Sequence, residues 1–296
     1  MIRRLIATAL VCGLWAAAAP AQDATYAIKF RQAAAGDRIR VTVSDESESG
    51  VALAGVDPQD VPKRKASIEL VYTEETVARP AGAKRPTKLV RTYATAEETH
   101  DGLSKTLPYL GKAVTIETGD KAFTFTADGA VLGDADAKAV AADLDRAADD
   151  PWRPTNLVPA KPVRVDDEWA LDAAKLTAAY GADGKITFDR AKTTATGRLT
   201  KAYRKASVQY GVIEVKVKLA PTELAGLKVG DNPAPLKADS RITVALTLDV
   251  CIDGSARTGK TTTVTTNTYV VDIPCVDLTV ASTSTRTRTV GPAGPK

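Results

Sequence analysis

The stretch from Arg241 to Ile252 reads RITVALTLDVCI, and polar and apolar residues alternate along most of it. A second stretch, from Thr261 to Asp272, reads TTTVTTNTYVVD and consists mainly of β-branched and aromatic residues. Alternation with a period of two places every second side chain on the same face of a strand. The segment between them, Asp253–Lys260, opens with the turn dipeptide Asp-Gly. We therefore predict an antiparallel hairpin over Arg241–Asp272.

The same alternation recurs along most of the chain, bounded by Gly, Asp and Pro, and is typical of antiparallel sheet. It covers Arg38–Val43, Ala66–Thr76, Lys88–Thr95, Gly111–Glu117, Ala122–Thr126, Gly197–Tyr203, Ser207–Leu219 and Asp277–Val290. A helical period appears in Ala137–Ala148, capped by Asp134 or Asp136, with Val140 and Leu144 on one face. A weaker helical pattern covers Asp172–Tyr180, and Pro221–Lys228 predicts one helical turn. The fold class is mainly β: a curved antiparallel sheet (a half-barrel or two packed sheets) with the amphipathic helix Asp136–Ala148 on a face.

The beginning of the chain has the pattern of a signal peptide. Arg3 and Arg4 precede the apolar run Leu5–Ala19, and Ala19-Pro20-Ala21 fits a cleavage site. The run is too short for a permanent membrane anchor, so we predict cleavage after Ala21, no transmembrane segment afterwards and export to the periplasm or the extracellular space.

Residues 22–290 are expected to form one β-rich domain. The Pro-rich segment Pro151–Pro162 leaves open two halves, 22–150 and 163–290, and residues 291–296 are expected to be a disordered tail.

The chain has 296 residues and a formal net charge of +4, which falls to +2 when Arg3 and Arg4 leave with the signal peptide. Such an even balance of basic and acidic residues argues against nucleic acid as a partner. Cleavage of the signal peptide leaves two cysteines, Cys251 and Cys275, and export places them in an oxidising compartment. In the predicted hairpin an extended strand would put Cys275 about 40 Å from Cys251. A disulfide therefore needs a bend or another pairing, and both outcomes stay open.

Gly254–Thr261 matches the phosphate-binding loop pattern G-x-x-x-x-G-K-[ST] at every required position. That chemistry requires a helix after the loop, because the helix N-terminus completes the anion site. The residues that follow, from Thr262 onward, are strongly β-prone. We interpret the match as a hairpin loop and predict no nucleotide cofactor.

Other candidate sites have simpler structural explanations. His100-Asp101-Gly102-Leu103-Ser104 brings three triad residue types together without a G-x-S-x-G elbow, which favours a polar turn. Asp134 and Asp136 suit helix capping better than calcium binding, and a single His excludes a His-rich zinc site. Seven basic residues on two predicted strands fit an anionic partner or solvated faces: Lys192, Arg198, Lys201, Arg204, Lys205, Lys216 and Lys218. We assign no catalytic, cofactor-binding or metal residue.

Pro159-x-x-Pro162-Val163-x-Val165-x-Asp167-x-Trp169 resembles the P-x-x-P-V-x-V-G-D-x-W stretch of a family of exported bacterial proteins of unknown function. Tyr26–Phe30 followed by Ala35-Gly36-Asp37 is similar to the first strand pair of that family. Asp166 stands where the family has Gly. The resemblance implies a mainly β exported fold and carries over no functional residues.

A concave sheet closed by an amphipathic helix often leaves an apolar pocket. We therefore predict a non-enzymatic exported protein that binds a hydrophobic small molecule or an envelope protein. Trp152 and Trp169 are core residues or ligand platforms in this interpretation. One alternative is a carboxylate-based hydrolase. Another is an interaction module that adds the Thr-rich strands Thr261–Asp272 and Asp277–Val290 to a partner's sheet.

Overall fold

The computed structural model describes residues 24–53, 56, 61–83, 85–119, 123–141, 144, 152–181, 184–229, 232–273 and 276–294. The expected signal peptide, residues 1–21, and Cys275 lie outside these residues. The first half of the chain holds β1 (Arg38–Leu53), β2 (Arg64–Ala78), β3 (Lys88–His100), β4 (Leu103–Thr106), β5 (Ala113–Thr118), β6 (Phe123–Ala127), β7 (Ala130–Val131) and α1 (Asp134–Ala141).

The second half begins with η1 (Pro154–Asn156), β8 (Glu168–Ala170), α2 (Ala173–Tyr180), β9 (Ile186–Phe188) and η2 (Arg190–Lys192). It continues with β10 (Thr194–Lys205), β11 (Val208–Leu219), β12 (Pro221–Val229), β13 (Asn232–Pro235), β14 (Arg241–Cys251), β15 (Gly259–Ile273) and β16 (Val276–Pro292).

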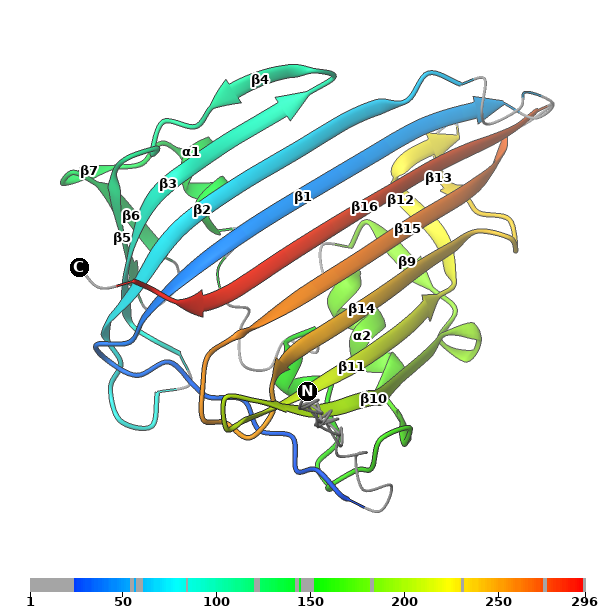
Figure 1. Cartoon of the computed structure of the whole chain (residues 1–296). Coiled ribbons are helices and arrows are strands. Elements are labelled where there is room, and N and C mark those ends of the chain that lie inside the picture. The colour runs from blue at the N-terminus through cyan, green and yellow to red at the C-terminus, as the bar shows by residue number, and fades with distance from the viewer. Residues whose placement is uncertain are drawn as a thin grey trace, which may run out of the picture.

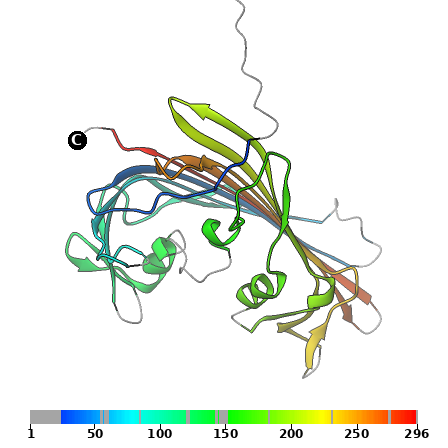
Figure 2. The same cartoon turned by 90° about the horizontal axis from the view of Figure 1, so that it is seen from below.

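One antiparallel sheet contains strands from both halves of the chain, in the order β7-β6-β5-β3-β2-β1-β16-β15-β14-β11-β10-β8. The sheet is curved, and its two outermost strands do not pair with each other (Figure 1). Figure 2 shows α1 and α2 beneath the arch, on its concave side. A separate small sheet has the order β13-β12-β9. The predicted fold class, a curved antiparallel sheet with a helix on one face, is confirmed.

Hydrogen bonding in the middle of the sheet follows the predicted hairpin. β14 pairs with β15 from Arg241 opposite Thr268 to Val250 opposite Gly259. Residues Pro221–Val229 form the strand β12, so the helical turn predicted there is wrong. β12 pairs with β9 and β13, and these tertiary contacts outweigh the weak local preference.

The two chain ends also differ in detail from the predictions. β16 continues to Pro292 because it pairs with the start of β1, so residues 291 and 292 belong to the sheet and not to the expected tail. The segment around Tyr26–Phe30 makes isolated bridges, Tyr26 with Val163 and Lys29 with Asp253, instead of a strand pair. It therefore crosses from one part of the fold to another and does not join the sheet.

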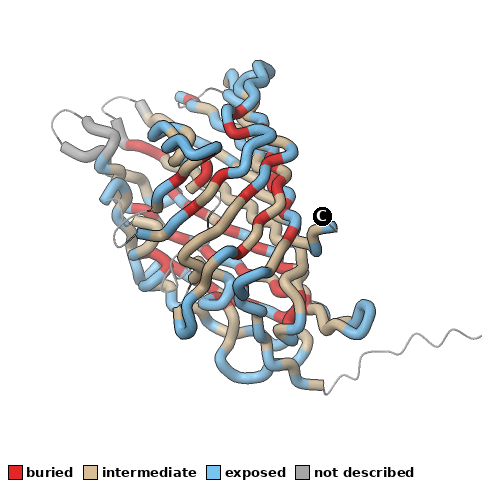
Figure 3. Tube along the Cα trace, turned by 90° about the vertical axis from the view of Figure 1, so that its left-hand side faces the viewer, coloured by how far each residue is buried: buried red, intermediate tan, exposed pale blue. Residues whose placement is uncertain are grey.

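Buried side chains form two separate clusters, and burial alternates along the strands (Figure 3). The first cluster draws on β1, β2, β3, β5 and β6, with Val140 of α1 packed into it. The second draws on β10, β11 and β14, with Leu176 of α2 packed into it. Each helix thus closes one half of the concave face.

The strands between the two clusters, β15 and β16, have few fully buried side chains. Threonines on β15 such as Thr261 to Thr263 are half-buried on both faces of the sheet. Threonine is β-branched and favours a strand, yet its hydroxyl needs no apolar surroundings. The centre of the concave face is consequently polar, with an apolar core on either side.

The segment that carries the family resemblance packs onto the second cluster. Asp166 has φ of 73°, a conformation that glycine adopts readily, and its carboxylate lies 2.8 Å from Nη2 of Arg198. The Nε1 of Trp169 donates to the carbonyl oxygen of Leu157 at 3.0 Å. Gly197 faces the Trp169 ring so closely that a Cβ there would lie 2.4 Å from it. Trp169 is therefore a packing residue.

Candidate functional site

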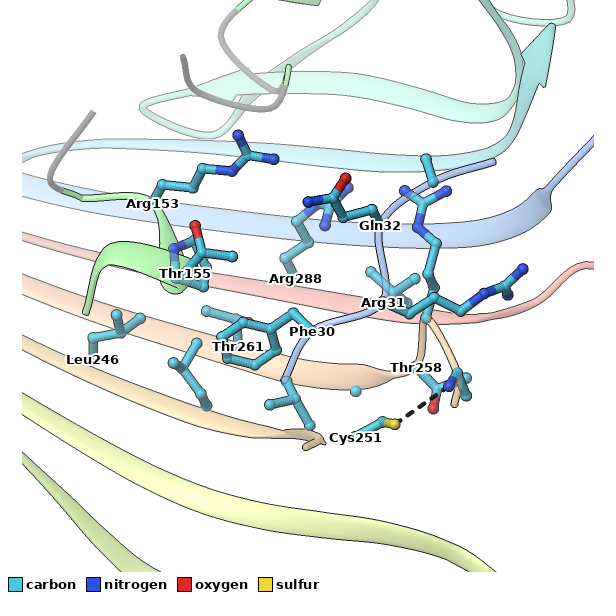
Figure 4. Close-up of a pocket in the computed structure, with 18 of the residues that line it drawn as sticks. Phe30, Arg31, Gln32, Arg153, Thr155, Leu246, Cys251, Thr258, Thr261 and Arg288 are labelled. Atoms are coloured by element: carbon cyan, nitrogen blue, oxygen red, sulfur yellow. Dashed lines mark hydrogen bonds between the residues drawn. The ribbon is translucent and has the colours of Figure 1, made fainter. Parts of the chain in front are cut away.

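A pocket of about 390 Å³ lies on the concave face, between the two apolar clusters (Figure 4). Its volume falls within the range of about 300–1,000 Å³ that is typical of small-molecule sites. The floor consists of inward-facing residues of β14, β15 and β16. These are Val244, Leu246, Leu248, Val250, Gly259, Thr261, Thr263, Arg286, Arg288 and Val290.

The register of these strands gives the floor a polarity gradient. Leu248 of β14 is opposite Thr261 of β15, which is opposite Arg288 of β16. One row along, Leu246, Thr263 and Arg286 line up in the same way. Two neighbouring rows therefore run from an apolar side chain through a hydroxyl to a guanidinium.

Three segments outside the sheet border the pocket. The chain before β1 contributes Phe30 to Ala33 and crosses in front of the strands in Figure 4. Its anchor is the backbone amide of Lys29, which donates to the carbonyl oxygen of Ile252 at 2.7 Å. The other two segments are Trp152 to Thr155, around η1, and Ala256 to Thr258, before β15.

Every charged side chain among the described lining residues is an arginine. The six are Arg31, Arg79, Arg153, Arg257, Arg286 and Arg288. Arg31 pairs with Asp37 at 2.7 Å, and Arg79 donates to the carbonyl oxygen of Ala33 at 2.6 Å. The Arg31 pair is internal to the chain before β1, and the Arg79 contact ties that chain to the residue that follows β2.

Arg286 faces Asp45 of β1 across a longer distance of 3.4 Å. Burial raises the pKa of Asp45, and the attraction and hydrogen bond of Arg286 offset only part of that effect. Asp45 and Arg286 are opposite each other on neighbouring strands and form an ion pair at the border of the pocket.

A buried charge cluster stands behind the pocket. Glu74 accepts from Nε of Arg91 at 3.0 Å and from Nη2 of the same residue at 2.9 Å. The second oxygen of Glu74 lies 3.6 Å from Nη2 of Arg257, whose side chain is 13% exposed. The Nη1 of Arg257 is buried and has no hydrogen-bond partner in the described part of the chain. Two guanidinium groups therefore interact with one carboxylate, and the Arg257 contact is the longer of the two.

The phosphate-loop match forms a hairpin loop, as predicted. The strand β15 starts at Gly259, where the phosphate-binding motif needs a helix. Gly259 is required by packing, because a Cβ there would lie 2.5 Å from Cγ1 of Val250. Hydrogen bonds from Ser255, Gln209 and Cys251 organise the loop around Asp253 and hold the pKa of that carboxyl well below its usual range.

The candidate triad residues do not form a relay. His100 is exposed, and its Nε2 lies 2.7 Å from Oε1 of Glu98. Ser104 pairs with Thr99 through their hydroxyls at 2.9 Å. Asp101 has φ of 47° in the turn between β3 and β4 and accepts from the amide of Lys65 at 2.8 Å. The segment is the polar turn that the sequence favoured.

The remaining candidates are distributed over the surface and the core. Cys251 is a buried free thiol, so no disulfide to another described residue forms. Of the seven basic residues predicted on two strands, three have acidic partners: Arg198 with Asp166, Lys192 with Asp189 and Lys216 with Glu214. Within the described ranges, no group of three or more His, Cys, Asp or Glu residues is arranged to hold a metal ion.

The alternative of an interaction module that adds its Thr-rich strands to a partner's sheet does not fit the topology of the sheet. β15 pairs with β14 on one side and β16 on the other, and β16 pairs with β1 on its second side. All of their central backbone groups are therefore engaged within the sheet.

The pocket arginines escaped prediction because they come from separate parts of the sequence. Arg31, Arg153, Arg257 and Arg288 meet only through the sheet topology. A signal was present in Arg286 and Arg288, which share a face at strand spacing within a Thr-rich strand that has one further charged residue, Asp277. Trp152 lines the pocket and also packs against the second apolar cluster, so its position fits both interpretations of that residue.

No known family matches this chain, and no curated protein matches it in sequence. Among solved structures, an outer membrane channel from Pseudomonas putida F1 aligns over 89% of this chain and 98% of its own, with 7% identity and a TM-score of 0.21. A protein of Bacteroides fragilis NCTC 9343, provisionally assigned to the outer membrane, aligns over 81% and 95%, with 10% identity and a TM-score of 0.10. Scores this low carry no argument about this chain. None of its described helices is long and apolar enough to cross a membrane.

Proposed function

We propose that this is an exported, non-enzymatic protein that binds a hydrophobic small molecule in the pocket under β14–β16. The observation that supports the proposal is the apolar part of the pocket. Four inward-facing side chains of β14, from Val244 to Val250, form one wall, and Phe30 and Trp152 border the same space. Burial of apolar surface drives such binding, at about 25 cal/mol for each Å² removed from water.

The chemistry of the lining favours binding over hydrolysis. A carboxylate-based hydrolase needs acids of matched pKa at the substrate. Among the described residues that line the pocket, the ionisable side chains are arginines and the Cys251 thiol. Arginine is always charged at physiological pH and serves as a binding group, not as a proton shuttle.

Export rests on the first 21 residues of the sequence, with their two arginines, apolar run and Ala-Pro-Ala site. Native mass spectrometry of protein recovered from the exported fraction tests both parts of the proposal. We expect an adduct that is lost on denaturation, and a denatured mass that corresponds to a chain beginning at Gln22.

A neutral fluorescent probe, N-phenyl-1-naphthylamine, tests the pocket directly. We expect saturable binding with enhanced probe fluorescence, because the probe is apolar and emits strongly away from water. Thr261→Trp places an indole in the pocket and is expected to abolish this binding. Thr262→Trp is the matched control, since the adjacent residue of β15 points to the opposite face.

Loss of probe binding in the Thr261 variant alone would support the pocket as the binding site. Absence of binding to the native protein, or equal binding by the two variants, would contradict it. Far-ultraviolet circular dichroism of both variants verifies that the sheet is intact.

A further inference from the structure

We infer that the end of β10 is a docking site for an extended acidic segment of a partner protein, which joins the sheet as an additional strand. This inference is independent of the pocket and goes beyond the proposed function. It follows from the outer edge of β10, which the short strand β8 covers at residues 196–198. Backbone hydrogen bonds with Asp166 and Asp167 extend this contact by one residue, to Leu199.

Beyond Leu199, the hairpin of β10 and β11 continues past β8 and projects from the arch (Figure 2). β10 stays paired with β11 as far as Lys205 opposite Val208. On the outer side of residues 200–205, no backbone hydrogen bond joins β10 to another described segment. A stretch of this length spans about 20 Å, which matches a typical strand. The edge therefore offers unpaired backbone groups to an added strand.

Contacts within the fold fix the conformation of this part of the hairpin. The rings of Tyr203 and Tyr210 stack with their centroids 5.4 Å apart. The hydroxyl of Tyr203 donates to Asp249 of β14 at 2.6 Å. The Nε2 of Gln209 donates to the carbonyl oxygen of Tyr203 at 2.9 Å. The edge is thus already extended before a partner binds, which lowers the entropic cost of pairing.

Three exposed cations lie on the free part of the edge: Lys201, Arg204 and Lys205. None of the three has an ion-pair partner among the described residues. The Nζ of Lys201 instead lies 5.1 Å from the centroid of the Tyr203 ring. Lys201 and Lys205 share one face of the strand and Arg204 lies on the other, because side chains alternate. The free edge therefore carries positive charge on both of its faces.

Carboxylates near the hairpin are engaged elsewhere. Asp166 pairs with Arg198 at 2.8 Å, and Glu168 of β8 is opposite the same arginine. Asp249 accepts from the hydroxyl of Tyr203. The positive charge at the end of the hairpin is consequently available to a partner.

The sign of this charge selects the partner. Two copies of this chain paired through β10 would place cations against cations, and like charges on neighbouring strands are destabilising. An acidic segment would place opposite charges there and would satisfy the free backbone groups as well. Since the cations lie on both faces of β10, the segment needs acids on both of its own faces.

A fluorescent peptide, Thr-Val-Glu-Glu-Thr-Val-Glu-Thr-Val, tests this site on the native protein by anisotropy. When it runs antiparallel to β10, its three glutamates lie opposite Lys205, Arg204 and Lys201. Two analogues carry Gln or Lys in place of every Glu. We expect the acidic peptide to bind at least about fivefold more tightly than the Gln analogue and the Lys analogue to bind most weakly, because cross-strand charge pairs contribute to pairing. Equal binding of the three peptides would overturn the inference.

Backbone pairing is tested separately from charge. Two further analogues of the acidic peptide carry N-methyl groups on alternate amides, each along one edge of the peptide strand. Only one edge of the peptide faces β10. We therefore expect one analogue to bind at least about tenfold more weakly than the parent peptide and the other to bind as the parent does. Equal effects of the two methylations would overturn strand pairing.

Reversal of the charge on the hairpin should reverse the preference. The triple variant carries Lys201→Glu, Arg204→Glu and Lys205→Glu. We expect it to bind the Lys analogue at least about fivefold more tightly than the acidic peptide.

The matched control reverses three exposed cations on β11 and β14, which are paired on both edges. It carries Lys216→Glu, Lys218→Glu and Arg241→Glu. We expect it to retain the native preference for the acidic peptide. Loss of that preference in the control as well would attribute binding to the net charge of the protein and overturn the docking site.

The remaining outcomes are equally decisive. Native protein that binds none of the peptides would overturn the inference and leave the cations as charges that prevent edge-to-edge association. Phosphatidylglycerol vesicles that bind the native protein but not the hairpin variant, without binding of the acidic peptide, would assign the hairpin to a lipid surface instead. Both triple variants should bind N-phenyl-1-naphthylamine as the native protein does, so the pocket and the docking site can fail separately. Far-ultraviolet circular dichroism verifies that both variants are folded.

Discussion

Replacing Glu74 with glutamine would remove the negative charge that holds two buried arginines. The side chain of Glu74 is 6% exposed and that of Arg91 is 1% exposed, and their atoms are 2.9 Å apart. Removing one partner of a buried ion pair costs about 3–5 kcal/mol, because the other charge is left without compensation. The Gln oxygen still accepts one hydrogen bond, so we expect a loss near the lower end, about 3 kcal/mol.

Urea unfolding followed by circular dichroism measures this loss. A loss of about 3 kcal/mol is large against a total stability of about 5–15 kcal/mol, yet it leaves the chain folded in water. Glu69→Gln is the control, because Glu69 is exposed on the same strand and its side chain alternates with buried Leu70. It is expected to stay within about 0.5 kcal/mol of the native protein.

A second substitution tests the reason for the loss. Arg91→Met in the Glu74→Gln background removes one of the two charges that Glu74 offsets and keeps an apolar side chain of similar length, so part of the stability should return. A Glu74→Gln protein as stable as the Glu69 control would refute the claim that the buried pair stabilises the fold. A double variant less stable than the single one would refute the charge argument.

Three further changes test the sheet and its loops. Gly197→Ala brings a Cβ within 2.4 Å of the Trp169 ring and should cost about 1–3 kcal/mol in urea unfolding, whereas Gly133→Ala, with open space around it, should change little. Thr265→Pro removes a backbone donor from a strand paired on both edges and should prevent folding, seen as loss of soluble protein; a folded monomer would contradict the topology. Asp253 has a lowered pKa, so its carboxylate stabilises the fold above a pH of about 4, and that contribution is lost as the pH falls. Asp253→Asn should therefore unfold at less urea than the native protein at pH 7, with a difference that shrinks from pH 5 to pH 2; a constant difference would contradict the linkage.

Most strands were predictable because the alternation of polar and apolar residues lies within each strand's own sequence. The alternation over Arg241–Ile252 reports one buried face, and the structure places β14 at Arg241–Cys251. Asp172 illustrates a helix signal of the same local kind, since its side chain accepts from the amide of Lys175 at the start of α2. Such signals involve residues that are close in the sequence, so they can be recognised without any tertiary information.

Other features depended on contacts that a local pattern does not contain. Pro221–Val229 forms a strand because β9 and β13 lie beside it. The Thr-rich strands have no unpaired edge because β14 and β1 flank them. Strand period indicates which face a residue shares with its neighbours, but it does not indicate which strand comes next to it.

The sequence by itself determined a mainly β chain with a curved sheet, a hairpin in place of a nucleotide loop, and an even charge balance. Only the tertiary structure decided that six arginines of the described residues line one pocket beside an apolar wall. Arg31 and Arg288 are more than 250 residues apart in the chain, and they line the same cavity because β16 lies in the middle of the sheet while the segment before β1 crosses its concave face. Positive charge that is balanced over the whole sequence is thus concentrated locally by topology.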